Sequence, residues 1–344
     1  MIKSENTITV VSVQGNVVCM PAMESGSVQP PVKLKYTQYF RSFYENPFRN
    51  KNLELIFVRS IKTCEEKQMT DFRFISITPH PALNPFIAKI FVFEAGGRLP
   101  VEDRKLIVPN ANLKLTFTYR NGIVANVGDK TFVQAENKLS LTGLIDAPVK
   151  LDAQEDAQTG TIVIEFNPSG AYRFFHLSYF EINNQIVELA NLIGNEAAEL
   201  QARLTETITL PAKLEVLENF LIKQLEKTVA DPIYDYCLNR ISCTDGMITV
   251  TQLEKETRVS SRWLHTKFLE HVGTGPKNLS EIIRFKQIYY AYSTGVPLQE
   301  LKEQINHHYH DRSHFIRAFK RFTGFTPTDL QNSINELSTN HYRS

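Results

Sequence analysis

The sequence is poor in cysteine and has no long apolar run. Its 344 residues include four cysteines, and no two of them stand in a Cys-x-x-Cys pair. Sparse cysteines of this kind argue against a disulfide scaffold or a zinc ribbon and favour a reducing compartment. No apolar run approaches the ~18 residues that a membrane-spanning helix needs, and polar residues interrupt Ile8–Val18, so it does not resemble a signal peptide. We therefore expect a cytoplasmic protein without a membrane segment.

Charge of one sign is also lacking in the chain as a whole, where the formal net charge is +1. The distribution is uneven. Residues 249–344 hold 13 lysines and arginines against 9 acidic residues, a difference of +4, whereas residues 1–248 hold 25 against 28, a difference of −3. Seven of the nine histidines lie in the same C-terminal part. A mildly basic end on an acidic body is compatible with a polyanionic partner, although the excess is small.

Residues 1–68 differ from the rest of the chain. Met23–Pro31 has the composition of a linker, and Tyr36–Asn52 mixes aromatic and polar residues without a clean period. This segment is either a small strand-bearing extension or a poorly ordered stretch upstream of a true start at Met69. We favour the second interpretation, because strand-like sequence begins just after Met69.

Strand-like patterns extend from Phe72 to Phe166, separated by turn residues. The predicted strands are Phe72–Ile77, Ala88–Phe93, Leu113–Thr118, Thr131–Val133 and Thr161–Phe166. Asn121-Gly122 between two apolar alternations predicts a hairpin, and Gly128-Asp129 predicts a further turn. The pattern predicts a small antiparallel β structure, either a curled sheet or a partial barrel.

After Gly170 the period becomes helical. Leu214, Leu217, Leu221 and Leu225 recur at helical spacing, and Pro211 suits a first turn. Asp231-Pro232 predicts an N-cap followed by a first-turn proline. We expect Ile233, Tyr236, Cys237 and Ile241 to share one buried face of the next helix.

The C-terminal part contains an internal repeat at an offset of 51 residues. The offset superposes five pairs: Leu264 on Phe315, Phe268 on Phe319, Gly273 on Gly324, Pro276 on Pro327 and Leu279 on Leu330. In each copy an N-cap candidate, Ser260 or Asp311, begins a helix that a glycine ends. Two residues four apart in that helix share its buried face. The repeat therefore predicts two units of the same fold.

Each copy is preceded by a second short helix. Thr251-x-x-Glu254 is a capping-box pattern that opens a helix carrying Leu253, and Leu298, Leu301 and Ile305 supply the equivalent helix of the second copy. Two short helices joined by a short turn form a helix-turn-helix. Between the copies, residues 276–294 form a run that would be about 28 Å long as one helix. Successive major grooves on one face of B-DNA lie ~34 Å apart, so this connector could present two recognition helices to adjacent grooves.

These segments resemble a known family. Trp263–Lys277 (WLHTKFLEHVGTGPK), Ile283–Lys286 (IRFK) and especially Asp311–Pro327 (DRSHFIRAFKRFTGFTP) are similar to the AraC/XylS family of transcription regulators. The resemblance covers about residues 231–332. A weaker one, carried by Pro79–Pro85, Ile164–Gly170 and the helices to Lys227, extends to the β-rich N-terminal domain of one subset of that family. That subset's Arg-Phe-x-Pro-Gly-Gly is Glu165-Phe-Asn-Pro-Ser-Gly here.

Two further departures concern the turns of the helix-turn-helix units. The family commonly has glycine there, whereas this chain has Arg258 in the first unit and His308, before Tyr309, in the second. A left-handed conformation costs a residue other than glycine about 1 kcal/mol or more. We expect the fold to tolerate this cost. The resemblance also implies that Arg284, within the connector, is structural.

The face of each recognition helix opposite its apolar pair is expected to meet DNA, and these positions match those where the family reads bases. The predicted base contacts are Ser261, Arg262, His265 and Thr266 in the first unit and Arg312, Ser313, Ile316 and Arg317 in the second. Arginine can pair with a guanine edge, and Ile316 could meet a thymine methyl group. Lys267, Lys320 and Arg321 are predicted to contact phosphate.

Other readings of the same residues compete with these. His307, His308, His310 and His314 could be metal ligands, since His310 and His314 are four residues apart. We favour folding and capping roles for this segment and expect no metal and no cofactor. Trp263 is expected to pack at the domain surface rather than stack on a base.

The sequence therefore predicts an α+β protein. Residues 69–228 would form an antiparallel β-rich, sensor-like regulatory domain with trailing helices. Residues 229–335 would form an all-α domain in which a connector helix joins two helix-turn-helix units, and 336–344 a tail. The expected function is sequence-specific regulation of transcription, modulated by an unknown small-molecule effector or by oligomerisation. The protein is expected to be a monomer or a homodimer. Double-stranded DNA is the expected partner, and RNA polymerase is a further candidate.

Two alternatives remain open. The β domain could be an enzyme or a small-molecule-binding protein with accessory helices, although we expect no enzyme, because His80 and His176 are its only histidines and no catalytic cluster is evident. A non-specific architectural DNA binder would bind random sequence equally well.

Overall fold

The computed structural model describes residues 8–13, 16–21, 72–97, 105–293, 296 and 298–327. The chain divides into two units, Met1–Gln68 and Met69–Ser344. In the first unit, β1 (Ile8–Val13) pairs antiparallel with β2 (Asn16–Pro21), as the strand-bearing alternative predicted. The predicted linker Met23–Pro31, the proposed start at Met69 and the 336–344 tail lie outside the described residues and stay predictions.

The second unit begins with two antiparallel sheets. The larger one has the strand order β12-β9-β6-β11-β4-β3, and the smaller one has the order β5-β10-β7-β8. The strands of the larger sheet are β3 (Phe72–Ile77), β4 (Ile87–Ala95), β6 (Leu113–Arg120), β9 (Lys138–Thr142), β11 (Thr159–Phe166) and β12 (Ile186–Glu188). Those of the smaller sheet are β5 (Lys105–Ile107), β7 (Ile123–Val127), β8 (Lys130–Gln134) and β10 (Val149–Ala153).

All five predicted strands are present, but the predicted hairpin at Asn121-Gly122 is wrong. β6 and β7 belong to different sheets, so the chain crosses between the two layers at this point. Asn121 takes a positive φ of 52°, and its side-chain amide donates to the carbonyls of Glu155 and Ala157, which holds the corner. The two-residue hairpin is instead Gly128-Asp129, between Val127 and Lys130 of β7 and β8.

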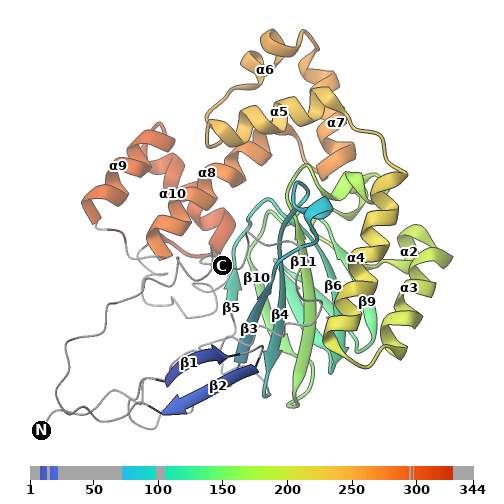
Figure 1. Ribbon diagram of the computed structural model, residues 1–344. Helices are drawn as coiled ribbons and strands as arrows, with labels where there is room; N and C mark the ends of the chain where they lie inside the picture. Colours follow the sequence, from blue (N-terminus) through green and yellow to red (C-terminus); the bar gives the residue numbers. More distant parts are fainter. Residues whose placement is uncertain are drawn as a thin grey trace, which may run out of the picture. The chain divides into compact units, whose positions relative to one another are not determined.

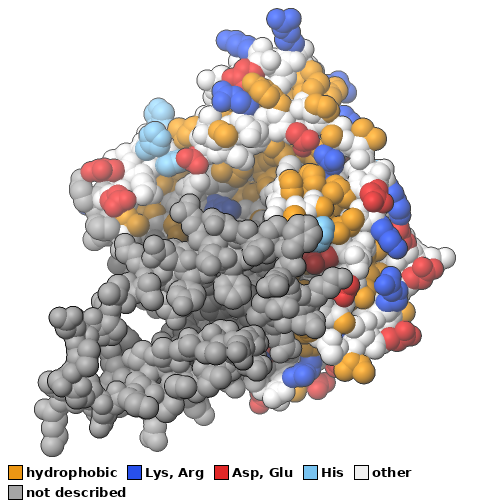
Figure 2. Space-filling model, in the orientation of Figure 1, with side chains coloured by type: hydrophobic (Ala, Val, Ile, Leu, Met, Phe, Trp, Pro, Cys, Tyr) orange, Lys and Arg blue, Asp and Glu red, His pale blue; other side chains and the backbone are white. Residues whose placement is uncertain are grey.

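Helices cover the outer face of the larger sheet (Figure 1). They are α2 (Ala190–Ile193), α3 (Asn195–Glu206) and α4 (Leu210–Glu226). The predicted leucines Leu214, Leu217 and Leu221 of α4 are buried, and Pro211 lies in its first turn. Basic and acidic side chains are interspersed on the outer side of these helices (Figure 2). Because both faces of the larger sheet are covered, every residue of its central strand β11 is buried.

The rest of the described chain is helical, which confirms the α+β class. It comprises α5 (Pro232–Cys243), α6 (Val250–Thr257), α7 (Ser261–Val272), α8 (Pro276–Ser293), α9 (Leu298–His308) and α10 (Arg312–Thr323). Asp231 caps α5, as predicted, through a hydrogen bond from the Tyr234 amide. Within the described residues, no helix is long and apolar enough to cross a membrane.

Candidate DNA-binding site

The first helix-turn-helix unit consists of α6 and α7. Its first helix begins two residues before the predicted cap, because Thr249 rather than Thr251 is the N-cap. Thr249 Oγ1 accepts from the Gln252 amide at 3.2 Å, and Gln252 Oε1 accepts from the Thr249 amide at 2.8 Å, which completes a capping box. The predicted box partner Glu254 serves elsewhere. Its carboxylate accepts from the backbone amide of Ser261, so it ties the end of α6 to the start of α7.

The turn between these helices has the backbone that the sequence predicted. Arg258 ends α6 in the left-handed region, with φ 59° and ψ 23°. Its amide still donates to the Glu254 carbonyl at 2.8 Å. Two residues later the Ser260 hydroxyl accepts from the Trp263 amide at 3.3 Å and caps α7. The predicted strain at Arg258 and the predicted cap at Ser260 are both confirmed.

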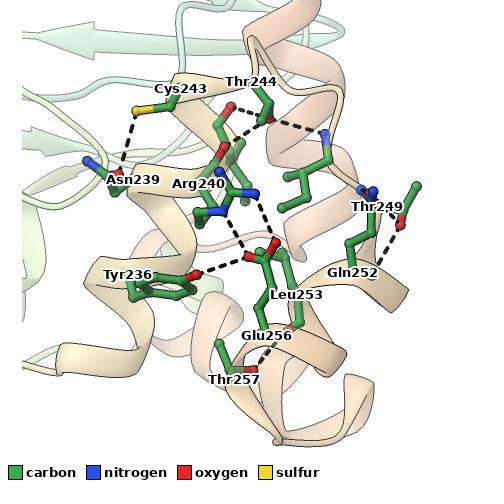
Figure 3. Close-up of polar contacts among 12 residues, drawn as sticks. Tyr236, Asn239, Arg240, Cys243, Thr244, Thr249, Gln252, Leu253, Glu256 and Thr257 are labelled. Carbon is green, nitrogen blue, oxygen red and sulfur yellow. Dashed lines mark hydrogen bonds and ion pairs between the residues drawn. The ribbon is translucent and has the colours of Figure 1, made fainter.

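An ion pair attaches α5 to this unit (Figure 3). Arg240 donates to both carboxylate oxygens of Glu256, at 2.8 and 2.9 Å, and the Tyr236 hydroxyl donates to the same group at 3.1 Å. The hydrogen bonds from Arg240 hold the pKa of Glu256 below its usual value. Tyr236 was predicted on the buried face of α5, but it is exposed, and Tyr234 and Leu238 are buried instead.

The second helix-turn-helix unit, α9 and α10, has a different turn. His308 was predicted to take a left-handed backbone, and this prediction is wrong. His308 is the last helical residue of α9, and the Tyr309 amide still donates to the Ile305 carbonyl at 2.9 Å. His308 and Tyr309 are buried, and burial raises the pKa of Tyr309 to about 12. Asp311 then caps α10, as predicted, by accepting from the His314 amide at 2.8 Å.

The repeated apolar pairs lie inward in both units. Leu264 and Phe268 of α7 are fully buried, and Phe315 and Phe319 of α10 are at most 6 % exposed. Both helices end at a glycine in the left-handed region, Gly273 with φ 86° and Gly324 with φ 78°. The partner Leu330 lies outside the described residues. Trp263 is half-buried against the core, in line with the packing role predicted for it.

Most of the predicted base-contacting side chains lie on the opposite, exposed face of the two helices. The exposed ones are Ser261, Arg262, His265 and Thr266 on α7 and Arg312, Ser313 and Arg317 on α10. Ile316 differs, because it is half-buried and packs against the core. Histidine side chains gather over the α9–α10 turn (Figure 2). Each recognition helix thus presents a polar face containing arginine, with its apolar face fixed beneath.

The three predicted phosphate contacts have unequal surroundings. Lys320 is exposed. Lys267 is half-buried and pairs with Glu270 at 2.8 Å, and its Nζ lies 5.9 Å from the Trp263 ring centroid. Arg321 pairs with Asp146 of the β domain at 2.7 Å and with Glu281 of α8 at 3.3 Å. The sequence offered no signal for the contact with Asp146, because 175 residues separate the partners.

The connector α8 spans 18 residues, one fewer than predicted, which corresponds to about 27 Å. Leu279, Ile282, Phe285 and Ile288 are buried along it. Phe285 packs against α10, with ring centroids 5.7 Å from Phe319 and 4.9 Å from Phe322. Arg284 is half-buried, as suits the structural role that was expected.

The histidine cluster does not form a metal centre in the described structure. Among the described residues, no group of three or more His, Cys, Asp or Glu side chains is placed to hold a metal ion. His308 Nδ1 instead lies 2.9 Å from the Gln304 carbonyl oxygen, one helical turn earlier.

The β domain contains a cavity that the sequence analysis did not predict. The volume of this cavity is about 120 Å³. Its walls come from facing strands of the two sheets and are mostly apolar: Phe74, Phe91, Phe93, Ile123, Ala125, Val127, Val149, Leu151 and Val163. Asn110, Asn112 and Lys114 supply polar groups at one part of the wall.

A buried carboxylate lies behind this polar part. Glu165 is 0 % exposed, accepts from Asn110 and Asn112 at 3.3 and 3.2 Å, and lies 3.6 Å from Lys114 Nζ. Lys89 and Lys286 also interact electrostatically with Glu165, and burial lowers the pKa of both lysines. Three lysines from β4, β6 and α8 therefore surround one carboxylate. The sequence contained a sign of this cluster. Lys89 lies on the same face of its strand as Phe91 and Phe93, and Lys114 on the same face as Thr116.

Comparison with known proteins matches two separate segments of the chain. Residues 253–333 match a helix-turn-helix domain family, and residues 75–188 match a domain of unknown function (DUF6597). No curated protein matches the chain. Among solved structures, ToxT from Vibrio cholerae shares 15 % identity over 72 % of this chain and 98 % of its own, with a TM-score of 0.40.

Two further structures illustrate the range of the likeness. ToxT from V. cholerae strain SCE256, bound to an unsaturated fatty acid, shares 13 % identity over 73 % of this chain and 96 % of its own, with a TM-score of 0.40. The cupin domain of Schizosaccharomyces pombe Cnp3 shares 10 % identity over 29 % of this chain and 66 % of its own, with a TM-score of 0.24.

The matched helix-turn-helix domain coincides with the repeat. Its residues 253–333 contain both recognition helices, the connector α8 and the whole signature Asp311–Pro327. The two units have an N-cap side chain, a buried apolar pair and a terminal glycine at equivalent positions. The C-terminal part of the chain is therefore a helix-turn-helix domain, as the resemblance to the AraC/XylS regulators implies.

Proposed function

We propose that the protein binds specific DNA sequences by placing α7 and α10 in two successive major grooves. The observation that carries this proposal is the duplication itself. Two helices, each with a side-chain N-cap, a buried apolar pair and a glycine end at equivalent positions, present polar faces and are joined by one packed helix of about 27 Å. Adjacent grooves lie ~34 Å apart on one face of B-DNA, so a connector of this length suits a single chain that reads both.

The two faces offer different chemistry. Arg312 and Arg317 of α10 can each make a bidentate contact with a guanine, whereas α7 has one arginine, Arg262, beside His265 and Thr266. The exposed Lys320 is suited to phosphate, which contributes affinity but not sequence information. We propose that α10 contributes more of the guanine recognition.

Selection of duplexes from a random library by the full-length protein tests this function. We expect one enriched motif with two parts about one helical turn apart, and affinity that falls steeply with salt. Replacing Arg317 by Ala should relax one base pair by about 1–3 kcal/mol, and replacing Arg262 by Ala should relax a position in the other part. Arg203→Ala on α3 is the matched control, because it removes an exposed arginine outside the site. Equal affinity for all duplexes would favour an architectural binder.

We propose further that the cavity of the β domain binds the effector. It could hold an apolar group, since its volume is many times the ~10–15 Å³ that one water needs. Lys114 lines the polar part of the wall together with Asn110 and Asn112, which favours an anionic group on the ligand. Lys286 of the connector α8 interacts electrostatically with Glu165, so the polar part of the β domain is linked to the helical domain.

Ligand binding can be tested with alkyl and aryl carboxylates and their uncharged amides. We expect the carboxylates to raise the thermal unfolding temperature of the protein and the amides to have less effect. Lys114→Gln should remove this preference, whereas Lys150→Gln, at an exposed position of β10, should keep it. Equal effects of carboxylates and amides would refute the anionic class.

A further inference from the structure

One loop of the β domain is braced by a neighbouring turn. The loop, residues 143–148, lies between β9 and β10, and the turn follows the short helix η4 (Tyr179–Ile182). Asp146 donates its backbone amide to Asn184 Oδ1 at 2.9 Å, and its carboxylate accepts from Asn184 Nδ2 at 2.6 Å. The Asn184 amide donates to the Leu144 carbonyl at 2.9 Å. We call loop 143–148 and η4 together the platform.

The platform contacts the C-terminal ends of both recognition helices. A Cβ added at Gly273, the end of α7, would lie 2.7 Å from the Tyr179 carbonyl oxygen, and one at Gly324, the end of α10, would lie 3.6 Å from Pro148. The carboxylate of Asp146 also accepts from Arg321 Nη2 at 2.7 Å and from Asn278 Nδ2 at 3.1 Å. Asp146 therefore joins the β domain to α8 and α10.

Arg321 lies one helical turn after Arg317, so the two side chains share one side of α10. Arg317 is one of the predicted base readers, and Arg321 one of the predicted phosphate contacts. In this structure the guanidinium of Arg321 instead contacts Asp146, Glu281 and the Asn278 side-chain oxygen, the last at 2.8 Å. Two carboxylates therefore already pair with Arg321, and a phosphate that approached its guanidinium would be repelled by them.

From this geometry we infer that Asp146 and a DNA phosphate compete for Arg321, so that the β domain restrains DNA binding by holding α10. The inference rests on the proposed function. Because coupling between two binding events is reciprocal, DNA that captures Arg321 loosens the platform, and a platform that holds Arg321 weakens DNA binding. Any effector that shifts the β domain relative to α8 would act through the same contact.

The test measures binding of the full-length protein to a duplex of random sequence by fluorescence anisotropy at several salt concentrations. Asp146→Asn should tighten binding by roughly two- to fivefold, the range of one exposed ion pair, relative to the control Asp129→Asn. It should also steepen the dependence of log affinity on log salt by about one. Asp129 lies in the exposed β7–β8 turn, so the control removes the same charge without touching Arg321.

A double variant shows whether Arg321 mediates the effect. In Arg321→Gln protein, adding Asp146→Asn should give no further gain in affinity. A gain that persists without Arg321, or an Asp146→Asn affinity equal to that of Asp129→Asn, would overturn the inference.

Hydrogen exchange of the unmodified protein gives a test that no folding defect can obscure. Amides in residues 143–148 and 179–182 should exchange faster when the duplex is bound, and slower or unchanged exchange would contradict the competition. Random-sequence DNA makes the test independent of the proposed specificity. Failure of the library selection would leave these measurements interpretable, and failure of the competition would leave the selected motif unaffected.

Discussion

The two helix-turn-helix units have an N-cap, a buried pair and a terminal glycine at equivalent positions, but different contacts hold them in place. In the first, Arg258 takes a left-handed backbone, Glu254 bridges to the start of α7, and the Arg240–Glu256 pair attaches α5. In the second, α9 continues through His308, and buried Tyr309 fills the turn. The β domain contacts both recognition helices, but it forms an ion pair with α10, through Asp146 and Arg321, whereas η4 packs against the glycine end of α7. The comparison teaches that cap, buried pair and terminal glycine specify the unit, whereas the turn can be built in more than one way.

The largest expected effect comes from the buried phenylalanines. Phe268→Ala and Phe319→Ala should each destabilise their unit by about 3–5 kcal/mol, because each leaves a cavity in a fully buried position. Trp263 on α7 is the only tryptophan of the chain, so its fluorescence during urea unfolding reports the first unit. We expect Phe268→Ala to shift this transition more than Phe319→Ala does. Equal shifts would mean that both units unfold together.

Glycine substitutions at the two turns should change the stability of their units in opposite directions. Arg258→Gly should stabilise the first unit by about 1 kcal/mol, because it removes the cost of a left-handed backbone. His308→Gly should destabilise the second by about 1 kcal/mol or more, because His308 is helical and buried. Urea unfolding followed by circular dichroism measures both. Stabilisation by His308→Gly would show that the second turn is strained like the first.

The smallest expected effect is a difference in pH dependence between the two N-caps, Asp311 and Ser260. The hydrogen bond from the His314 amide lowers the pKa of Asp311, so the folded state binds a proton less readily than the unfolded chain. Its stabilisation is present above the unfolded value near 4 and is lost as pH falls through the lower, folded pKa. Ser260 does not titrate. Acid should therefore lower the protection factor of the His314 amide, which is its exchange relative to the unfolded chain at the same pH, but not that of the Trp263 amide.

A control variant isolates this cap from other carboxylates. Asp311→Ser should make the protection factor of the His314 amide insensitive to acid. Glu256, whose pKa is also lowered, responds over a similar range but affects the α5–α6 contact rather than the first turn of α7. If the His314 amide responds to acid equally in Asp311→Ser, the cap carboxylate is not the cause.

Local patterns were sufficient for much of the fold. Five of the ten strands in the two larger sheets, the helical connector, both recognition-helix caps and both terminal glycines follow from period, capping chemistry and the need for positive φ. All of these act over a few residues. The Asn121-Gly122 hairpin failed because the turn signal does not tell which sheet the next strand joins. The left-handed backbone predicted at His308 was wrong because His308 is buried within its own unit as a helical residue, whatever the family's preference for glycine there.

The sequence by itself determined that the chain ends in two related helix-turn-helix units and which faces of α7 and α10 are polar, because a repeat and a helical period can be seen without long-range contacts. Only the tertiary structure decided what surrounds those faces. It brought Asp146 to Arg321 across 175 residues, and it gathered Lys89, Lys114 and Lys286 around Glu165. Electrostatic pairing depends on distance in space, and the order of residues along the chain does not contain that distance.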